Sequence, residues 1–455
     1  MVYFIVKHIC KLAIKTFYGK ISFRNRKKIP KDVPLLLLAN HTNAFMDSLV
    51  LAVFMARKMK SLPKGIVFLG ASKIKIWFFS QIGMIPIFRA IEGNEHLHRN
   101  EETFQNCFQV LKKKGCVQVF PEAICIPERR MKSAKKGTAR IALGAEEAHE
   151  YALNTQVLFV GMNYEKAWSF KSKLFLNYSR PYDISSFCKL HQENKVSGLN
   201  ALTKFIDIKI RPHVIHIDDK EDDDIVGQVE QIYKPQLFKD YRLKSENASH
   251  NFLLSREIAN GINYLRMERP EQLLELRNKC IAYFDKLNVN KIEDTYIFKR
   301  PNISYLLGKF LFLSLGFPLH IYGLVNNYIP AKISKTIADK VVKKTDFYSS
   351  VTMLAGICSF MVFYLLNFSI VVFFSESLAV SLIYGATLIL SGNFSTAYLS
   401  KLKAFKSMLR YWKFDKGEHV ELKELIHERS SLVEMLNNLK QVYRLRHQKN
   451  ITKNI

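Results

Sequence analysis

A histidine and an aspartate stand close together where an apolar run of the sequence ends. His41 follows residues 33–40, whose leucines predict a short buried strand, and Asp47 falls at the start of the next predicted helix. A histidine placed in this way can accept a proton from a hydroxyl group. The aspartate can hold the imidazole in one tautomer and stabilise its positive charge. Such pairs also occur by chance, so this pair alone does not distinguish a catalytic from a structural histidine.

A second group of residues suited to chemistry follows another predicted strand. The apolar run 115–122 ends in Phe120, Pro121 and Glu122, and a predicted helix opens at Gly137. Helix N-termini favour anions because their first N–H groups are unpaired. The residues between the strand and this helix include several cations: Arg129, Arg130, Lys132, Lys135 and Lys136. This stretch is therefore suited to an anionic group such as a phosphate.

The elements that must position these residues alternate along the chain. The apolar pattern predicts strands at 33–40, 65–72, 115–122, 156–164 and 173–181. It predicts helices at 45–59, 101–114 and 136–151. This alternation predicts an α/β core within residues 31–185.

In this order and spacing, four segments resemble the sequence blocks of the glycerophospholipid acyltransferase family. They are residues 40–47, residues 83–89 ending in Arg89, residues 120–122 and residues 160–164. The family includes glycerol-3-phosphate and 1-acylglycerol-3-phosphate acyltransferases. The wording of residues 40–47 is most similar to the branch of fungal-type glycerol-3-phosphate acyltransferases and their bacterial relatives. The resemblance implies a mixed-sheet α/β core with a helical insertion and a C-terminal transmembrane hairpin.

The resemblance also implies an activity. A membrane-bound enzyme would transfer a fatty acyl group from acyl-CoA or acyl-carrier-protein to a hydroxyl of glycerol 3-phosphate. Lysophosphatidic acid or another lysophospholipid is the alternative acceptor, and a non-catalytic membrane scaffold is the alternative class. No metal or cofactor is implied. A hydrolase would need a serine or cysteine nucleophile, and the sequence contains no Gly-x-Ser-x-Gly element.

Particular residues take roles from the same resemblance. His41 matches the catalytic base and Asp47 matches its partner. Acceptor binding falls to residues of the second and third blocks and of a Lys-x-Gly element before the following helix: Arg89, Phe120, Pro121, Glu122, Lys135 and Gly137. An arginine suits a phosphate because its planar guanidinium can donate two parallel hydrogen bonds.

The chain departs from the family pattern at several positions. Five residues separate His41 from Asp47, where the commonest motif has four, although the named branch tolerates five. Ala123 replaces the usual glycine after Phe-Pro-Glu, and Cys125 lies near the position of a frequent serine. Glycine permits positive φ or close backbone approach, which alanine restricts. These changes indicate altered substrate choice or a weakened enzyme.

The C-terminal third is typical of a membrane protein. Residues 347–374 and 378–399 contain no charged residue, and roughly 20 apolar residues cross a bilayer. The few residues between them predict a transmembrane hairpin. Lysines on both flanks predict that both ends, and with them the catalytic core, face the cytoplasm. Residues 303–325 are apolar but contain Lys309 and Pro318, which predicts an interfacial or re-entrant segment. If this segment crossed the membrane instead, the α/β core would lie on the opposite side.

The remaining regions give weaker signals. Residues 1–30 predict an amphipathic helix that lies in the membrane interface or packs on the core. Residues 186–300 predict a helical region of unknown role, and residues 301–415 are the membrane region. Residues 416–455 predict a charged helix that is solvated or pairs with another helix, in this chain or another. The acidic run 218–224 predicts a solvated loop.

Charge and cysteine usage limit the partners. Against 40 acidic residues stand 68 Lys and Arg, for a net charge of +28, which predicts polyanionic partners. These basic residues concentrate beside the apolar segments, so we expect a lipid bilayer and no nucleic acid. The seven cysteines are scattered and odd in number, which favours a reduced, cytosol-facing chain.

Overall fold

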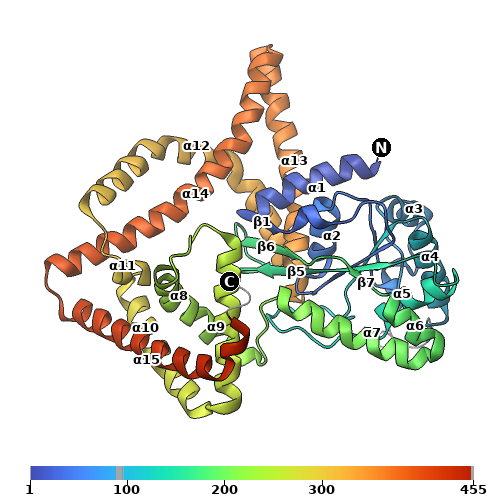
Figure 1. Ribbon diagram of the computed structural model, residues 1–455. Coiled ribbons are helices and arrows are strands. Elements are labelled where there is room, and N and C mark those ends of the chain that lie inside the picture. The colour runs from blue at the N-terminus through green and yellow to red at the C-terminus, as the bar shows by residue number, and fades with distance from the viewer. Residues whose placement is uncertain (1, 89–94, 96, 452–455) are drawn as a thin grey trace. The chain divides into compact units, whose positions relative to one another are not determined.

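The chain forms two compact units in the computed structural model, which describes residues 2–88, 95 and 97–451 (Figure 1). The first unit consists of Met1–His216 and Val341–Met353. The second consists of Ile217–Lys340 and Leu354–Ile455. The α/β core predicted from the sequence lies in the first unit.

A mixed sheet forms the centre of the first unit. Its strands are β1 (Lys20–Arg24), β2 (Leu35–Ala39), β3 (Lys60–Ser61), β4 (Cys116–Val119), β5 (Gln156–Tyr164), β6 (Lys173–Tyr178) and β7 (Tyr182–Asp183). The order is β1-β6-β5-β2-β4-β3, and β7 pairs with β5. All pairs are parallel except those of β5 with β6 and β7. The predicted α/β class with a mixed sheet is confirmed.

Strand β2 lies between β5 and β4 and is buried along its whole length. Leu36 and Leu38 belong to the main hydrophobic cluster on one face, and side chains alternate along a strand, so Leu35 and Leu37 face the other. A continuous apolar run is typical of a parallel strand covered on both faces. The strand that carries His41 is therefore fixed by packing from both sides.

Helices cover both faces of this sheet. The helices of this unit are α1 (Val2–Phe17), α2 (Ala44–Phe54), α3 (Lys73–Gln81), α4 (Asn100–Lys112), α5 (Gly137–Glu147), α6 (Ser185–Glu193) and α7 (Lys195–Ile210). Of these, α3 has no buried residue and does not cover the sheet. In the view of Figure 1, α1 and α2 lie above the sheet and α5, α6 and α7 lie below it. Residues of α4, α5 and α7 pack with β2, β4 and β5 in the main cluster.

The sequence predictions differ from this unit in three places. Residues 65–72 were expected to form a strand, but Gly65–Phe68 forms a 3₁₀ turn and Gly70 has a φ of +68°, which no strand accommodates. The sheet begins at β1, before the predicted start of the core at residue 31. Helices α6 and α7 continue the unit beyond residue 185, because Ile206 and Ile210 pack in the main cluster.

The second unit is helical. Its elements are α8 (Asp223–Asp240), α9 (Ala248–Glu268), α10 (Pro270–Asn290), α11 (Asp294–Phe298), α12 (Ile303–Val341), most of α13 (Tyr348–Ser375), α14 (Leu378–Lys416) and α15 (Val420–Ile451). The C-terminal helix packs within this unit: Leu425 and Leu432 are buried, and Arg429 Nε lies 2.9 Å from Asp294 Oδ1.

The acidic run 218–224 is not a wholly solvated loop, contrary to expectation. Asp222 is fully buried. Its Oδ1 accepts hydrogen bonds from Arg266 Nη2 at 3.0 Å and Arg277 Nη2 at 2.6 Å. The two guanidinium groups come from α9 and α10, a pairing over 44 and 55 residues that local composition does not reveal.

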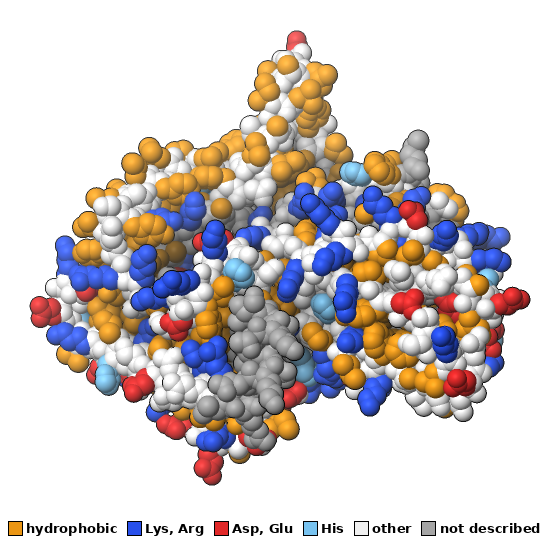
Figure 2. All heavy atoms as spheres, viewed as in Figure 1, with side chains coloured by type: hydrophobic (Ala, Val, Ile, Leu, Met, Phe, Trp, Pro, Cys, Tyr) orange, Lys and Arg blue, Asp and Glu red, His pale blue; other side chains and the backbone are white. Residues whose placement is uncertain are grey.

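Three helices of the chain's described part are long and apolar enough to cross a membrane: Ile303–Val341, Thr345–Ser375 and Leu378–Lys416. The last two contain the predicted hairpin, and Figure 2 shows hydrophobic side chains over its projecting end. Helix α12 runs unbroken through Pro318 and Pro330, whereas the sequence predicted a shorter interfacial or re-entrant segment. Its hydropathy and length suit a crossing helix equally well.

Candidate active site

The end of β2 and the start of α2 bring the predicted histidine and aspartate together. His41 follows β2, and Asp47 lies in the first turn of α2. His41 Nδ1 is 3.0 Å from Asp47 Oδ2, and both side chains are buried. Because the carboxylate accepts the Nδ1 proton, Nε2 retains its lone pair. The imidazole is thus held in the tautomer that a general base requires.

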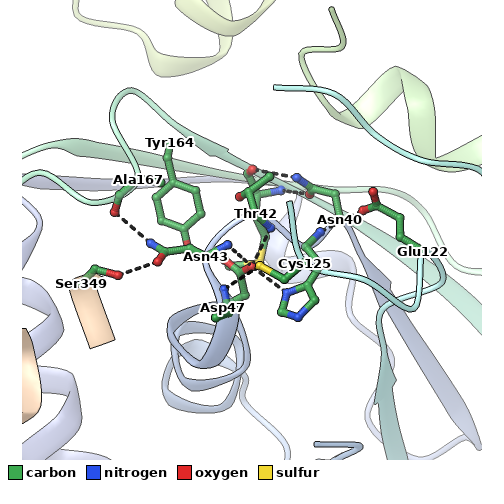
Figure 3. A network of polar contacts seen from close by, with 12 residues as sticks. Asn40, Thr42, Asn43, Asp47, Glu122, Cys125, Tyr164, Ala167 and Ser349 are labelled. Carbon is green, nitrogen blue, oxygen red and sulfur yellow. Dashed lines mark hydrogen bonds and ion pairs between the residues drawn. The ribbon is translucent and has the colours of Figure 1, made fainter. Parts of the chain in front are cut away.

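The Asp47 carboxylate is held by further donors (Figure 3). Its Oδ2 accepts the backbone N–H groups of Thr42 at 2.9 Å and Asn43 at 2.8 Å. Its Oδ1 accepts the hydroxyl of Tyr164, from the end of β5, at 2.7 Å. Burial and the neighbouring Asp47 raise the pKa of Tyr164 well above its usual value, so it remains a donor. These bonds compensate for burying a charge and fix its direction.

Strand β4 supplies the other wall of the histidine. Leu38 on β2 pairs with Val119 on β4, so the residues after both strands leave the same edge of the sheet. The Phe120 ring stacks on the His41 ring with centroids 3.8 Å apart and planes 4° apart. The stacking leaves the imidazole little freedom to rotate away from Asp47.

Glu122 fastens the backbone around the site. Its Oε1 accepts the N–H of His41 at 3.0 Å, and its Oε2 accepts the N–H of Lys132 at 2.8 Å. The side chain is 2% exposed, and burial raises its pKa from 4.5 to about 7 despite those two bonds. Asp47 adds to the rise and Arg211 opposes it. Glu122 therefore changes charge near neutral pH.

Ala123 stands in the conformation that favours glycine. Its φ is +59°, in the left-handed region, and its N–H donates to the carbonyl of Phe120 at 3.1 Å. An L-residue other than glycine in this region costs about 1–2 kcal/mol. The turn that carries Glu122 is therefore kept despite the loss of the family's glycine, at the expense of backbone strain.

Cys125 occupies part of the loop over the histidine. Its Sγ accepts the N–H of Ala44 at 3.0 Å, and the N–H of the next residue, Ile126, donates to the carbonyl of His41 at 3.1 Å. Burial and Asp47 raise the pKa of this thiol, so it is kept protonated. The cysteine thus supports the start of α2 and is unsuited to act as a nucleophile.

Asn43 ties the His–Asp loop to distant parts of the first unit. Its amide nitrogen donates to the carbonyl of Ala167 at 2.8 Å and to the hydroxyl of Tyr18 at 2.9 Å. Its Oδ1 accepts the hydroxyl of Ser349 (Figure 3). Ser349 lies in the first turn of α13, one of the three apolar helices, and belongs to the first unit.

The other predicted site residues lie around this centre. Pro121 accepts the N–H of Lys135 at 2.8 Å, while the Lys135 side chain is exposed. Gly137 opens α5, as predicted, and a Cβ there would meet no atom within 4 Å. Arg89 lies outside the described residues. For Phe120, Pro121 and Glu122 the structure gives contacts to the protein itself, so their acceptor-binding role stays a prediction.

Sequence reasoning missed several residues that support the site. Tyr164 ends the fourth sequence block, which was recognised without a role for the tyrosine. Asn43 lies within the first block, residues 40–47, which likewise predicts no role for it. Tyr18 and Ser349 carried no signal, because they reach the site from positions 25 and 306 residues away from Asn43.

The fold and the site define a class: an α/β domain with a buried His–Asp pair at one edge of its sheet, in a chain with three helices apolar enough to cross a membrane. Residues 20–163 match the family model described as Acyltransferase. Residues 20–163 therefore contain a domain of the acyltransferase family.

Individual relatives match shorter stretches. The chain is 31% identical over 108 residues to glycerol-3-phosphate O-acyltransferase 2 of Saccharomyces cerevisiae, covering 24% of this chain and 14% of that protein. It is 28% identical over 141 residues to the chloroplastic 1-acyl-sn-glycerol-3-phosphate acyltransferase LPAT1 of Arabidopsis thaliana, covering 31% and 37%. The chain thus spans well under two thirds of these relatives' length.

A solved structure is also similar. The 1-acyl-sn-glycerophosphate acyltransferase PlsC of Thermotoga maritima aligns with a TM-score of 0.34 and 18% identity, covering 46% of this chain and 77% of that one.

Proposed function

We propose that this protein transfers a fatty acyl group from a thioester to a hydroxyl of glycerol 3-phosphate, in phospholipid biosynthesis. One observation carries the proposal. The Nδ1 of His41 is engaged by a fully buried Asp47 at 3.0 Å, which leaves Nε2 as the proton acceptor. The family supplies the reaction class, acyl transfer between a donor and a glycerol-phosphate-type acceptor.

The chemistry needs only groups that the chain provides. The acceptor hydroxyl gives its proton to His41 Nε2 as its oxygen forms a bond to the thioester carbonyl carbon. Asp47 stabilises the resulting imidazolium. The tetrahedral intermediate then expels the thiolate, which takes the proton from His41, so the products are an ester and a free thiol. A positioned base of this kind contributes a factor of about 10²–10⁴ to the rate.

Binding of the acceptor phosphate is assigned to Arg89 and the cations near α5. Lys135 is exposed beside the N-terminus of α5, where unpaired N–H groups add to the attraction. Phe120, Pro121 and Glu122 would act on the acceptor through the loop that they stabilise. The acyl donor is acyl-CoA or acyl-carrier-protein, with the acyl chain in an apolar groove or in the bilayer.

Lysophosphatidic acid is the second candidate acceptor. One curated relative is named for glycerol 3-phosphate and another for its 1-acyl derivative. The wording of residues 40–47 favours glycerol 3-phosphate. We place the protein in a membrane through its apolar helices. The lysines that flank the hairpin place both of its ends in the cytoplasm, and the catalytic core lies on the same side because we take α12 not to cross the bilayer.

A non-catalytic scaffold is the third candidate. Its best support is Ala123 in place of glycine together with the wider spacing between His41 and Asp47. Because Ala123 adopts the left-handed conformation and the Phe120–Glu122 turn is kept, the substitution leaves the histidine's supports in place. This favours an enzyme.

The test is transfer by the full chain purified in detergent. Labelled acyl-CoA and acyl-carrier-protein are offered with glycerol 3-phosphate or with lysophosphatidic acid. We expect lysophosphatidic acid as the product and at least about 10²-fold less of it with His41→Ala. His191→Ala is the matched control, because His191 is also buried but pairs with Tyr151 away from the site. Transfer that survives His41→Ala would refute the mechanism, and product from lysophosphatidic acid alone would refute the acceptor.

Arg89 has its own test. We expect Arg89→Ala to raise KM for the phosphorylated acceptor more than it changes kcat. Arg180→Ala is the control, since Arg180 is an exposed arginine of the same unit that packs over Tyr182. An unchanged KM in Arg89→Ala would remove this residue from the phosphate site.

A further inference from the structure

One segment of the α/β unit carries bare apolar side chains. It comprises residues 65–83, including the 3₁₀ turn Gly65–Phe68 and helix α3 (Lys73–Gln81). Ile74 is 79% exposed, and Ile66 and Trp77 are each 54% exposed. None of the residues of α3 is buried.

The two ends of this segment are fixed to the α/β unit by backbone pairing and packing. Ser61 pairs with Met84 and Lys64 with Ile87, so the chain leaves and re-enters the unit through one short ladder. Leu62 and Ile85 belong to the main hydrophobic cluster. The exposed part is therefore an excursion from a packed edge of the unit.

The excursion itself is well formed. The Ser72 side chain caps α3 by accepting the N–H of Lys75. The Phe68 and Phe79 rings meet at 5.0 Å, which joins the 3₁₀ turn to the helix. Trp77 and Ile74 take no such part and extend outward. The exposed apolar surface thus belongs to a folded element.

Helix α3 carries apolar side chains on several sides, interspersed with polar residues. Ile74, Trp77 and Phe78 lie on one side by their spacing, and Ile76 and Phe79 lie on others. Large apolar side chains exposed together on one folded element normally mark a contact with a protein or a membrane. Because its own unit does not bury α3, we look for that contact outside the unit.

The charges of the region identify that contact. The sequence has no acidic residue between Asp47 and Glu92. Lys73 and Lys75 lie on α3 itself, and lysines near an anionic lipid surface are attracted to it. Tryptophan is enriched at the boundary between headgroups and hydrocarbon. An apolar tip with lysines and a tryptophan, and without acids, matches an anionic bilayer.

We propose that residues 65–83 insert into the interface of an anionic phospholipid bilayer and form a membrane contact separate from the apolar C-terminal helices. The bilayer is the occupant because the same chain carries three helices suited to cross one. Helix α1 of the same unit also exposes Phe4 and Leu12, so the unit has more than one apolar element for this contact. The proposal does not depend on the acyl transfer reaction.

The chain offers a direct reporter, because its three tryptophans are Trp77, Trp168 and Trp412. The double variant Trp168→Phe/Trp412→Phe keeps only Trp77. The full chain is placed in vesicles of phosphatidylcholine and phosphatidylglycerol with brominated acyl chains, which quench tryptophan on contact. We expect the fluorescence of Trp77 to fall strongly relative to unbrominated vesicles.

A matched control uses an exposed apolar residue elsewhere on the unit. Val196 is 62% exposed at the start of α7, beside Lys195, in the layer below the sheet (Figure 1). Val196→Trp is made in a chain whose native tryptophans are all phenylalanine. We expect its fluorescence to stay nearly unchanged by brominated lipid. Equal quenching at positions 77 and 196, or none at 77, would overturn the proposal.

A second variant tests the part played by charge. Lys73→Glu/Lys75→Glu in the Trp77 reporter should reduce quenching in anionic vesicles, while circular dichroism confirms that the chain is folded. A Trp77 that is shielded from aqueous iodide but not quenched by brominated lipid would show that another protein surface covers α3. That result would also overturn the proposal.

Discussion

Replacing Glu122 by glutamine should remove a specific pH dependence from the stability of the α/β unit. The folded protein raises the pKa of this carboxyl from 4.5 to about 7, mainly by burial. Between these two values the folded state therefore binds more protons than the unfolded state. The contribution of Glu122 to the free energy of unfolding is fully present below pH 4.5 and is lost as the pH rises through about 7.

The size of the effect follows from the same shift. A pKa that moves from 4.5 to about 7 corresponds to about 3 kcal/mol of free energy of unfolding. Glutamine carries no charge at any pH, so it removes this loss. It also turns one acceptor oxygen into an amide donor, which leaves the N–H of His41 or Lys132 unpaired at about 1–3 kcal/mol.

The two effects give the variant a distinctive profile. We expect Glu122→Gln to be less stable than the wild type near pH 4.5 and to approach or exceed it near pH 8. For a unit of this size, about 1 kcal/mol corresponds to about 2–4 °C in Tm. The assay measures Tm as a function of pH in detergent for both proteins. The difference between the two Tm values is plotted against pH, because the contributions of the other titrating groups cancel in it.

Glu146→Gln is the control for this experiment. Glu146 is equally buried and accepts backbone N–H groups from Leu153 and Thr155, but it does not touch His41. We expect this variant to lose stability and to keep its acyl transfer activity. Parallel pH curves for wild type and Glu122→Gln would refute the reasoning on Glu122.

Three further changes test the supports of the site. Ala123→Gly removes about 1–2 kcal/mol of backbone strain, but the more flexible glycine stabilises the unfolded state by about 0.4–1 kcal/mol. The net effect should be a slightly higher Tm with His41-dependent transfer retained. A lower Tm would show that the turn is not strained. Ser349→Ala removes the bond to Asn43 and should lower kcat by about fivefold, or about 1 kcal/mol, while the protein stays in the membrane fraction; an unchanged kcat would show that this bond does not position the loop. In Asp47→Asn the amide oxygen still accepts a hydrogen bond from His41, and the Tyr164 hydroxyl can accept one from the amide nitrogen, so the fold should survive. The imidazolium loses its counter-charge, so kcat should fall by at least about 10²-fold. A near-normal kcat would contradict the role of Asp47.

Much of the α/β unit could be predicted because its signals are local. A few adjacent residues suffice to predict each element and its buried face. Examples are the leucines of β2, the apolar run of β5 and the helical spacing of apolar residues in α4. Residues 65–72 misled the same reasoning. Their apolar side chains predicted a buried strand, but they begin an exposed excursion, and periodicity does not show what covers an apolar residue.

The candidate site divides in the same way. The His41–Asp47 contact could be predicted, since strand end and helix start are adjacent in sequence and a recognised block contains both. The hydroxyl of Tyr164 reaches Asp47 over 117 residues, and only the sheet order brings β5 beside β2. For Glu122 the sequence predicts a role in acceptor binding, which stays a prediction. The bonds from its oxygens to the backbone N–H groups of His41 and Lys132 are contacts that residue type does not reveal.

The bond between Asn43 and Ser349 has a consequence for biosynthesis. It joins residues 306 positions apart, so the loop that carries His41 is completed only after most of the chain has been synthesised. Domains generally begin to fold as the ribosome releases them, N-terminal parts first, and long-range contacts form late. The first turn of α13 must therefore dock on a nearly finished α/β unit. Assembly of the histidine's surroundings is thereby timed to the emergence of the first helix of the hairpin.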